Sequence, residues 1–127
     1  MVTYVKHLKN ILTHIVDSYQ ILETIEDKPG DLAKIEKEML KINGFIKVVS
    51  NKIDIDKIPN SDFKVIKIKF SDYLQNYSFE KEIITMAPLY SNDVSRIKNM
   101  RMKILEALEN KNMLVNVKEL LDNLWPN

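Results

Sequence analysis

Apolar residues recur along the first half of the chain in alternating steps of three and four. This is the a/d spacing of packed α-helices, so we expect two helices, over about residues 3–26 and 30–51. Between them, the sequence Asp-Lys-Pro-Gly-Asp at 27–31 cannot continue a helix. The pattern therefore predicts an antiparallel αα-hairpin at the start of the chain. Its two apolar stripes consist of Val5, Leu8, Leu12, Ile15, Tyr19 and Leu22, and of Leu32, Ile35, Met39, Ile42, Ile46 and Val49.

The segment 63–70, Phe-Lys-Val-Ile-Lys-Ile-Lys-Phe, is rich in residues that favour strands. As a strand, however, it would place lysines among apolar residues on both of its faces. As a helix over 63–77, with Ser61 as N-cap, the segment places its main apolar residues within about 100° of arc on one face. We therefore predict a helix, which leaves Val65 and Ile68 outside that face. The apolar face consists of Phe63, Ile66, Phe70, Tyr73, Leu74 and Tyr77.

Further helices are predicted in the last third of the chain. Ser78 is placed to cap a short helix over about 79–87, which Pro88 ends. A longer helix opens at Ser91 or Asn92 and runs to about Asn110. It should turn Val94, Ile97, Met100, Ile104 and Leu108 inward and leave Met102 and Leu105 outside. A last short helix carries Val117, Leu120, Leu121, Leu124 and Trp125 and ends at Pro126.

These elements predict an all-α fold for the whole chain. We expect a single domain over residues 1–127, built as a compact bundle of four main helices plus one or two short ones. With only two glycines and four prolines, the composition also favours helices over a turn-rich β fold. Gly44 lies inside the second predicted helix, where it either weakens the helix or allows a close backbone approach.

Composition excludes several classes of protein. Hydrophobic residues make up 45% of the 127 residues and charged residues 29%, which is typical of a folded globular chain. The absence of cysteine excludes disulfides, zinc–thiolate sites and thiol nucleophiles. No apolar run has the length of a signal peptide or of a membrane span, so we expect a cytoplasmic protein without membrane contact. The net charge of +1 favours neither nucleic acid nor an anionic membrane.

Candidate catalytic and metal-binding residues are few. His7 and His14 lie seven residues apart on the solvent side of the first helix, about 10.5 Å from each other, which is too far for one metal ion. The aspartates at 54, 56 and 62 do not fit a calcium loop, because Ile58 and Pro59 occupy the positions that need a carboxylate or amide and a glycine. We therefore expect no enzyme, no cofactor and no metal.

Basic residues provide the nucleic-acid hypothesis. Residues 39–70 hold seven lysines and three aspartates. Phe70, Tyr73 and Tyr77 could stack on bases there, although their place on the apolar face favours a core role. The basic residues at 96, 98, 101 and 103 divide between the two flanks of an apolar stripe and so form no single basic face. The candidate nucleic-acid contacts are Lys52, Lys57, Lys64, Lys67 and Lys69.

The function predicted from the sequence is a non-enzymatic helical protein–protein interaction module. We expect a small subunit or adaptor of a larger assembly, with a protein partner or self-association, because a/d seams readily pair. The alternative is a nucleic-acid-binding accessory protein that uses the lysine-rich region 41–69. The candidate partner-binding residues are Val65, Ile68, Leu120, Leu121, Leu124 and Trp125, of which tryptophan is a frequent binding anchor.

Overall fold

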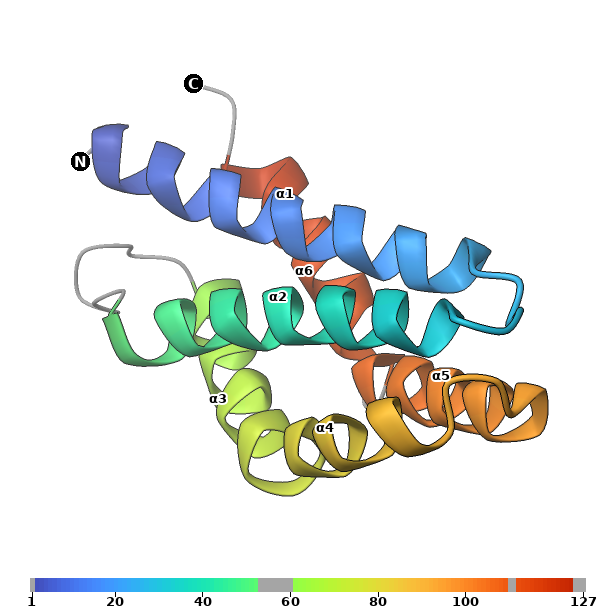
Figure 1. The fold of residues 1–127 in the computed structure, drawn as a ribbon. Helices are drawn as coiled ribbons and strands as arrows, with labels where there is room; N and C mark the ends of the chain where they lie inside the picture. Colours follow the sequence, from blue (N-terminus) through green and yellow to red (C-terminus); the bar gives the residue numbers. More distant parts are fainter. Residues whose placement is uncertain (1, 53–60, 110–111, 125–127) are drawn as a thin grey trace.

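The structure, a computed structural model, describes residues 2–52, 61–109 and 112–124. Within these ranges the chain forms six helices and no strand, so the all-α prediction is confirmed (Figure 1). The ambiguous segment 63–70 lies inside a helix, as predicted. The helices are α1 (Val2–Thr24), α2 (Asp31–Lys52), α3 (Ser61–Asn76), α4 (Glu80–Leu89), α5 (Val94–Glu109) and α6 (Met113–Leu124).

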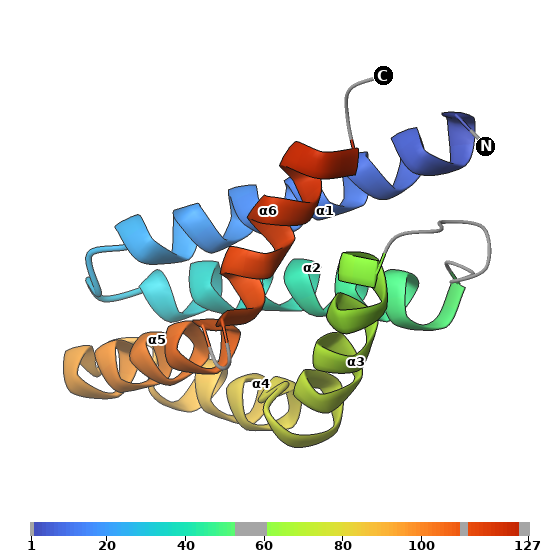
Figure 2. The same cartoon turned by 180° about the vertical axis from the view of Figure 1, so that it is seen from behind.

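The two long helices α1 and α2 lie side by side and run in opposite directions (Figures 1 and 2). Their apolar stripes face the interior. Every stripe position from Leu8 to Leu22 and from Leu32 to Val49 is buried, and Val5 at the start of α1 is half-buried. Burial of these side chains stabilises the pair far more than helix propensity does.

The other four helices cover this pair and complete the core. Helix α3 and helix α4 pack on α2, and α5 packs on both α1 and α2. Helix α6 crosses between α1 and α3, as Figure 2 shows. The buried side chains of all six helices form one contiguous cluster.

The turn between α1 and α2 is anchored to the connection between α4 and α5. Asp27 and Gly30 adopt left-handed backbone conformations, with φ of 62° and 90°. The backbone N–H of Gly30 donates to the carbonyl of Ser91, at 2.7 Å, in the connection between α4 and α5. The Asp31 carboxylate accepts the backbone N–H of Lys28 at 3.0 Å, which closes the turn onto the start of α2.

Helix α4 differs from its prediction at both ends. The residue before its first turn is Phe79, in a left-handed conformation with φ of 56°, and no side-chain cap from Ser78 is present. Pro88 lies inside the last turn, and the helix ends at Leu89. The N–H of Tyr90 donates to the carbonyl of Met86 at 2.9 Å, so the helical ladder continues past the proline.

Two packing expectations in α5 are wrong, and the structure distinguishes between the two alternatives for Gly44 in α2. Val94 is exposed, because it is the first residue of α5 and precedes the turns that contact other helices. Leu105 is buried, because α5 packs on more than one neighbour and its buried face is wider than one stripe. At Gly44, an added Cβ would meet nothing within 4 Å, so this glycine serves no close approach.

Candidate functional site

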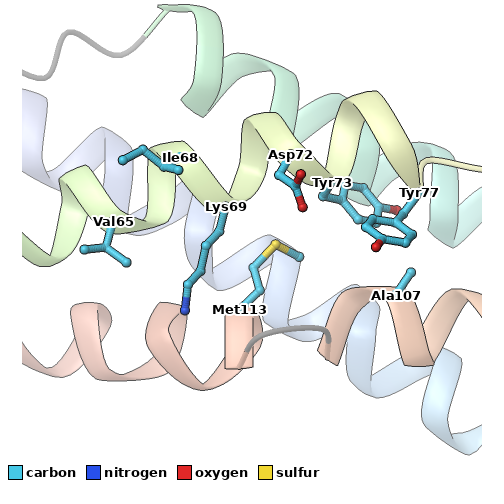
Figure 3. A pocket seen from close by; sticks show the side chains of 8 residues that line it. All are labelled: Val65, Ile68, Lys69, Asp72, Tyr73, Tyr77, Ala107 and Met113. Carbon is cyan, nitrogen blue, oxygen red and sulfur yellow. The ribbon is translucent and has the colours of Figure 1, made fainter.

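A groove of about 290 Å³ lies between α3 and the junction of α5 with α6 (Figure 3). The wall formed by α3 carries two exposed apolar side chains, Val65 at 44% and Ile68 at 67% of their full exposure. Apolar side chains this exposed and next to a groove are typical of a binding surface. The groove is lined by Val65, Ile68, Lys69, Asp72, Tyr73, Tyr77, Ala107 and Met113.

The inner wall of the groove is fixed by a buried hydrogen-bond network. The hydroxyl of Tyr73 donates to Oδ1 of Asn43 at 2.7 Å, and Nδ2 of Asn43 donates to the carbonyl of Ser78 at 3.0 Å. These bonds join α2, α3 and the connection to α4. Burial, and then the negative charge of Glu80, raise the pKa of Tyr73 above its usual range. Tyr73 is therefore a neutral phenol that holds the wall in place and does not act as a base.

Polar side chains also bridge the two sides of the groove. The ammonium group of Lys69 donates to Oδ1 of Asn116, which ties α3 to α6. Nδ2 of Asn76 donates to the Asp72 carboxylate at 2.9 Å along α3. These contacts use the polar groups to hold the helices. Among the apolar side chains that line the groove, Val65 and Ile68 are exposed, whereas Ala107 and Met113 are buried.

The candidate partner-binding residues divide between groove and core. Val65 and Ile68 lie on the groove. Leu120 is completely buried, so the prediction that it forms part of a surface patch is wrong; α6 crosses between α1 and α3 and turns this side chain inward. Leu121 is half-buried against the core. The side chain of Leu124 and the whole of Trp125 lie outside the described residues.

The lysines predicted to contact nucleic acid do not share one face of α3. At 100° per residue, Lys67 and Lys69 point about 160° apart around the helix. Lys64 is exposed, whereas Lys67 and Lys69 are half-buried. Lys52 is exposed at the end of α2, and Lys57 lies outside the described residues.

The aromatic residues near these lysines belong mainly to the core. Phe70 and Tyr73 are buried, which confirms the core interpretation for both, and Tyr77 is half-buried at the groove. Phe70 and Tyr73 therefore cannot stack on bases without unfolding part of the core.

Most basic residues of α5 are engaged within the chain. Nε and Nη2 of Arg101 donate to the two carboxylate oxygens of Asp27, at 2.7 and 2.8 Å. Arg96 pairs with Asp93 at 3.2 Å, with its guanidinium over the ring of Tyr90, and Lys103 pairs with Glu82 at 3.1 Å. Lys98 is exposed. These contacts favour structural roles over phosphate binding.

The structure does not bring the candidate metal-binding histidines and carboxylates together in the part of the chain that it describes. His7 and His14 are exposed on α1, as predicted, and the His14 ring stacks on Phe45 of α2 with centroids 5.3 Å apart. In the part of the chain that the structure describes, no three metal-ligating side chains gather. Residues 54 and 56 and the side chain of Asp62 lie outside that part.

Sequence reasoning missed Asp72 and three further residues that build the groove and its wall. Asn43 follows Met39 by four residues and precedes Ile46 by three, so its position on the buried face of α2 was readable from the spacing. Met113 precedes Val117 by four residues and extends the last apolar stripe in the same way. Ala107 follows Ile104 by three residues and continues the steps of three and four from Ile97 through Met100, so its buried position was readable from the spacing as well.

None of the helices that the structure describes is long and apolar enough to cross a membrane. Comparisons of the chain with protein-family models, with curated proteins and with solved structures find no match. The groove and its surroundings are therefore the basis for a functional proposal.

Proposed function

We propose that this protein is a non-enzymatic helical protein–protein interaction module, a small cytoplasmic subunit or adaptor, and that it binds an amphipathic helix in the groove along α3. The observation that carries the proposal is the exposure of Ile68, at 67%, beside an apolar groove. Leaving this side chain in water costs free energy that a partner would recover by burying it.

A helix suits this groove better than an extended peptide. Its walls are helices, whose backbone groups are hydrogen-bonded within each helix, so they offer no open edge for strand addition. From Val65 to Tyr77, the α3 wall is about 18 Å long at 1.5 Å per residue, which matches about three turns of a bound helix. Apolar side chains spaced three and four residues apart on that helix would reach Val65 and Ile68.

Affinity capture of tagged variants from the native host tests this proposal. We expect the wild-type protein to retain a stoichiometric protein partner that Ile68→Glu loses, because a carboxylate cannot be buried in an apolar contact without cost. Ile84→Glu is the matched control, since Ile84 is 51% exposed on α4 and does not line the groove. Circular dichroism confirms that each variant is folded. A partner that Ile68→Glu still retains would contradict the proposal.

The same experiment tests the nucleic-acid alternative. That function predicts co-purifying nucleic acid that is released by nuclease and by moderate salt, and that is lost on charge reversal of Lys64 and Lys67. Recovery of such nucleic acid, with no dependence on Ile68, would favour the alternative over the groove.

A further inference from the structure

We infer that the solvent side of α2 binds the phosphate backbone of a nucleic acid, without regard to base sequence. The inference goes beyond the proposed function, because it concerns a surface other than the groove between α3 and the junction of α5 with α6. It assigns the module a second partner, and it does not depend on whether the groove binds a helix.

Four lysines form one row along α2, which we call the lysine stripe. At 100° per residue they fall within about 60° of arc, and no acidic residue of α2 falls within that arc. The arc is centred about 140° from the middle of the buried face of the helix, so the stripe points to solvent. All four side chains are exposed, and the row is about 27 Å long at 1.5 Å per residue. The stripe consists of Lys34, Lys37, Lys41 and Lys52.

The charge that the stripe presents to solvent is positive. Lys34 lies 3.4 Å from the Asp31 carboxylate, and Lys41 lies 3.4 Å from the Glu38 carboxylate. These lysine side chains are 73% and 47% exposed, whereas the two carboxylate side chains are only 10% and 8% exposed. A phosphate that approaches from solvent therefore meets the ammonium groups before the carboxylates. The other two lysines of the stripe have no ion pair among the residues that the structure describes.

Helix α1 adds polar side chains beside the C-terminal half of the stripe. The His14 ring stacks on Phe45 of α2, and the start of α1 lies beside the end of α2 (Figure 1). Because the two helices are antiparallel, the exposed side chains of His7 and Asn10 lie level with the residues that follow Phe45. Imidazole and amide N–H groups are common donors to the phosphate oxygens of nucleic acids.

No carboxylate from either helix opposes a phosphate at this end of the pair. Residues 2–16 of α1 contain two lysines and two histidines, residues 39–52 of α2 contain three lysines, and neither range contains an aspartate or a glutamate. A chain with a net charge of only +1 therefore concentrates positive charge on the side-by-side ends of two helices. Such local concentration is the electrostatic signature of a surface that binds nucleic acid.

A nucleic acid suits this surface better than an anionic membrane does. A helix that lies on a membrane inserts large apolar side chains next to its basic residues. The middle of the solvent side of α2 instead carries Ala33 and Gly44, and an added Cβ at Gly44 would meet nothing within 4 Å. Over about 27 Å, one strand of a duplex presents about eight phosphates at 3.4 Å each, enough for every lysine of the stripe to contact one.

Fluorescence anisotropy of a labelled DNA duplex of mixed sequence, about 24 base pairs long, tests the inference between about 50 and about 200 mM salt. We expect the wild-type chain to bind with a dissociation constant between about 1 and about 100 μM, and with a salt slope of about −3.6 for four phosphate contacts. Lys37→Gln with Lys52→Gln should weaken binding at least about tenfold and bring the slope to about −1.8. Lys81→Gln with Lys98→Gln is the matched control: it makes the same charge change at exposed positions of α4 and α5 and should alter neither quantity.

A gain of affinity provides a second test, because unfolding cannot produce it. Asp17 is exposed on α1, three residues after His14, and its carboxylate repels a phosphate at this edge of the surface. Asp17→Lys should therefore tighten duplex binding at least about threefold. Unchanged or weaker binding in Asp17→Lys would contradict the placement of the duplex beside α1.

The same assay separates the lysine stripe from the other surfaces of the chain. Ile68→Glu in the groove, and Lys64→Gln with Lys67→Gln on α3, should both bind the duplex as the wild-type chain does. If the α3 variant loses binding and the stripe variant keeps it, the phosphate contacts belong to α3 and the inference is wrong.

Three further results would overturn the inference: no wild-type binding at about 50 mM salt and about 100 μM protein, equal losses in the stripe and control variants, or tighter binding to phosphatidylserine vesicles than to the duplex. None of them would remove the proposed function. That function fails separately, if a captured partner is indifferent to Ile68→Glu.

Discussion

The ion pair between Arg101 and Asp27 is the residue-scale contact with the largest predicted effect on stability. Its two side chains are only 13% and 10% exposed, and it holds the turn after α1 against α5. Arg101→Ala leaves the Asp27 carboxylate nearly buried without a counter-charge. We expect the free energy of unfolding to fall by about 3 kcal/mol, measured by urea denaturation at neutral pH.

A matched control is the pair of Arg96 with Asp93, whose side chains are 51% and 42% exposed. Solvent screens this pair, so Arg96→Ala should cost less than about 1 kcal/mol even though the guanidinium also lies over the Tyr90 ring. Equal losses for Arg96→Ala and Arg101→Ala would show that burial does not decide the strength of these pairs.

The Asp31 carboxylate predicts how stability changes with acid. The backbone N–H of Lys28 and the nearby ammonium of Lys34 lower the pKa of Asp31 below its usual 3.8, against the opposing effect of burial. A lowered folded-state pKa adds stability that is complete above the unfolded value and is lost as the pH falls through the folded value. We therefore expect the free energy of unfolding to decrease from about pH 5 to about pH 2.

Asp31→Asn should reduce this slope, because its side chain does not titrate, and chemical denaturation across the same pH range measures the difference. Asp17→Asn, a change at an exposed position of α1, should keep the wild-type slope. An unchanged slope in Asp31→Asn would mean that other carboxylates carry the acid sensitivity.

Single residues also show where sequence reasoning ends. The periodicity predicted the buried positions of α1 and α2, because core side chains must recur on one helix face. The helical wheel placed Arg101 on a flank of α5, but its partner Asp27 lies 74 residues earlier. Nothing in local spacing identifies a polar partner at that distance.

At the scale of the helix, the two glycines give opposite predictions. Gly44 lies inside α2 with open space around it, so Gly44→Ala should raise the free energy of unfolding by about 1 kcal/mol. Gly30 has φ of 90°, where an alanine is strained, so Gly30→Ala should lower it by about 1 kcal/mol or more. Thermal unfolding followed by circular dichroism measures both changes, and effects of the same sign would contradict the helical and turn roles assigned here.

Helix boundaries were predictable where local chemistry decides them. The turn at 27–31 and the helical nature of 63–70 followed from breakers and periodicity. The prediction for α4 was wrong at its ends, because Phe79 takes a left-handed conformation and Pro88 is tolerated in the last turn.

The arrangement of the whole molecule was less accessible from sequence. The groove needs Tyr77, Ala107 and Met113 to meet, and they come from three separate parts of the chain. The exposed positions Val65 and Ile68 were predicted from the wheel of one helix. Leu120 and Leu105 were misplaced, because their burial depends on which helices α5 and α6 contact.

Unequal burial across the six helices predicts unequal local stability. Helix α2 contacts α1, α3, α4 and α5, whereas α4 packs mainly on α2 and buries Ile83 as its only fully buried residue. Opening α4 would expose little apolar surface, so its amides should exchange with solvent before those of α2, with protection at least about tenfold lower.

Native-state hydrogen exchange at neutral pH measures this order helix by helix. Helix α6 is the matched control, because it is also short but buries Met113, Leu114, Val117 and Leu120. If helix length alone set the protection of the amides, those of α4 and α6 would exchange at similar rates. If burial sets it, the amides of α6 should exchange more slowly than those of α4. Since the groove is walled by α3, α5 and α6, early opening of α4 would leave the proposed interface intact. Exchange of α4 as slow as that of α6 would show that the six helices open only as one cooperative unit.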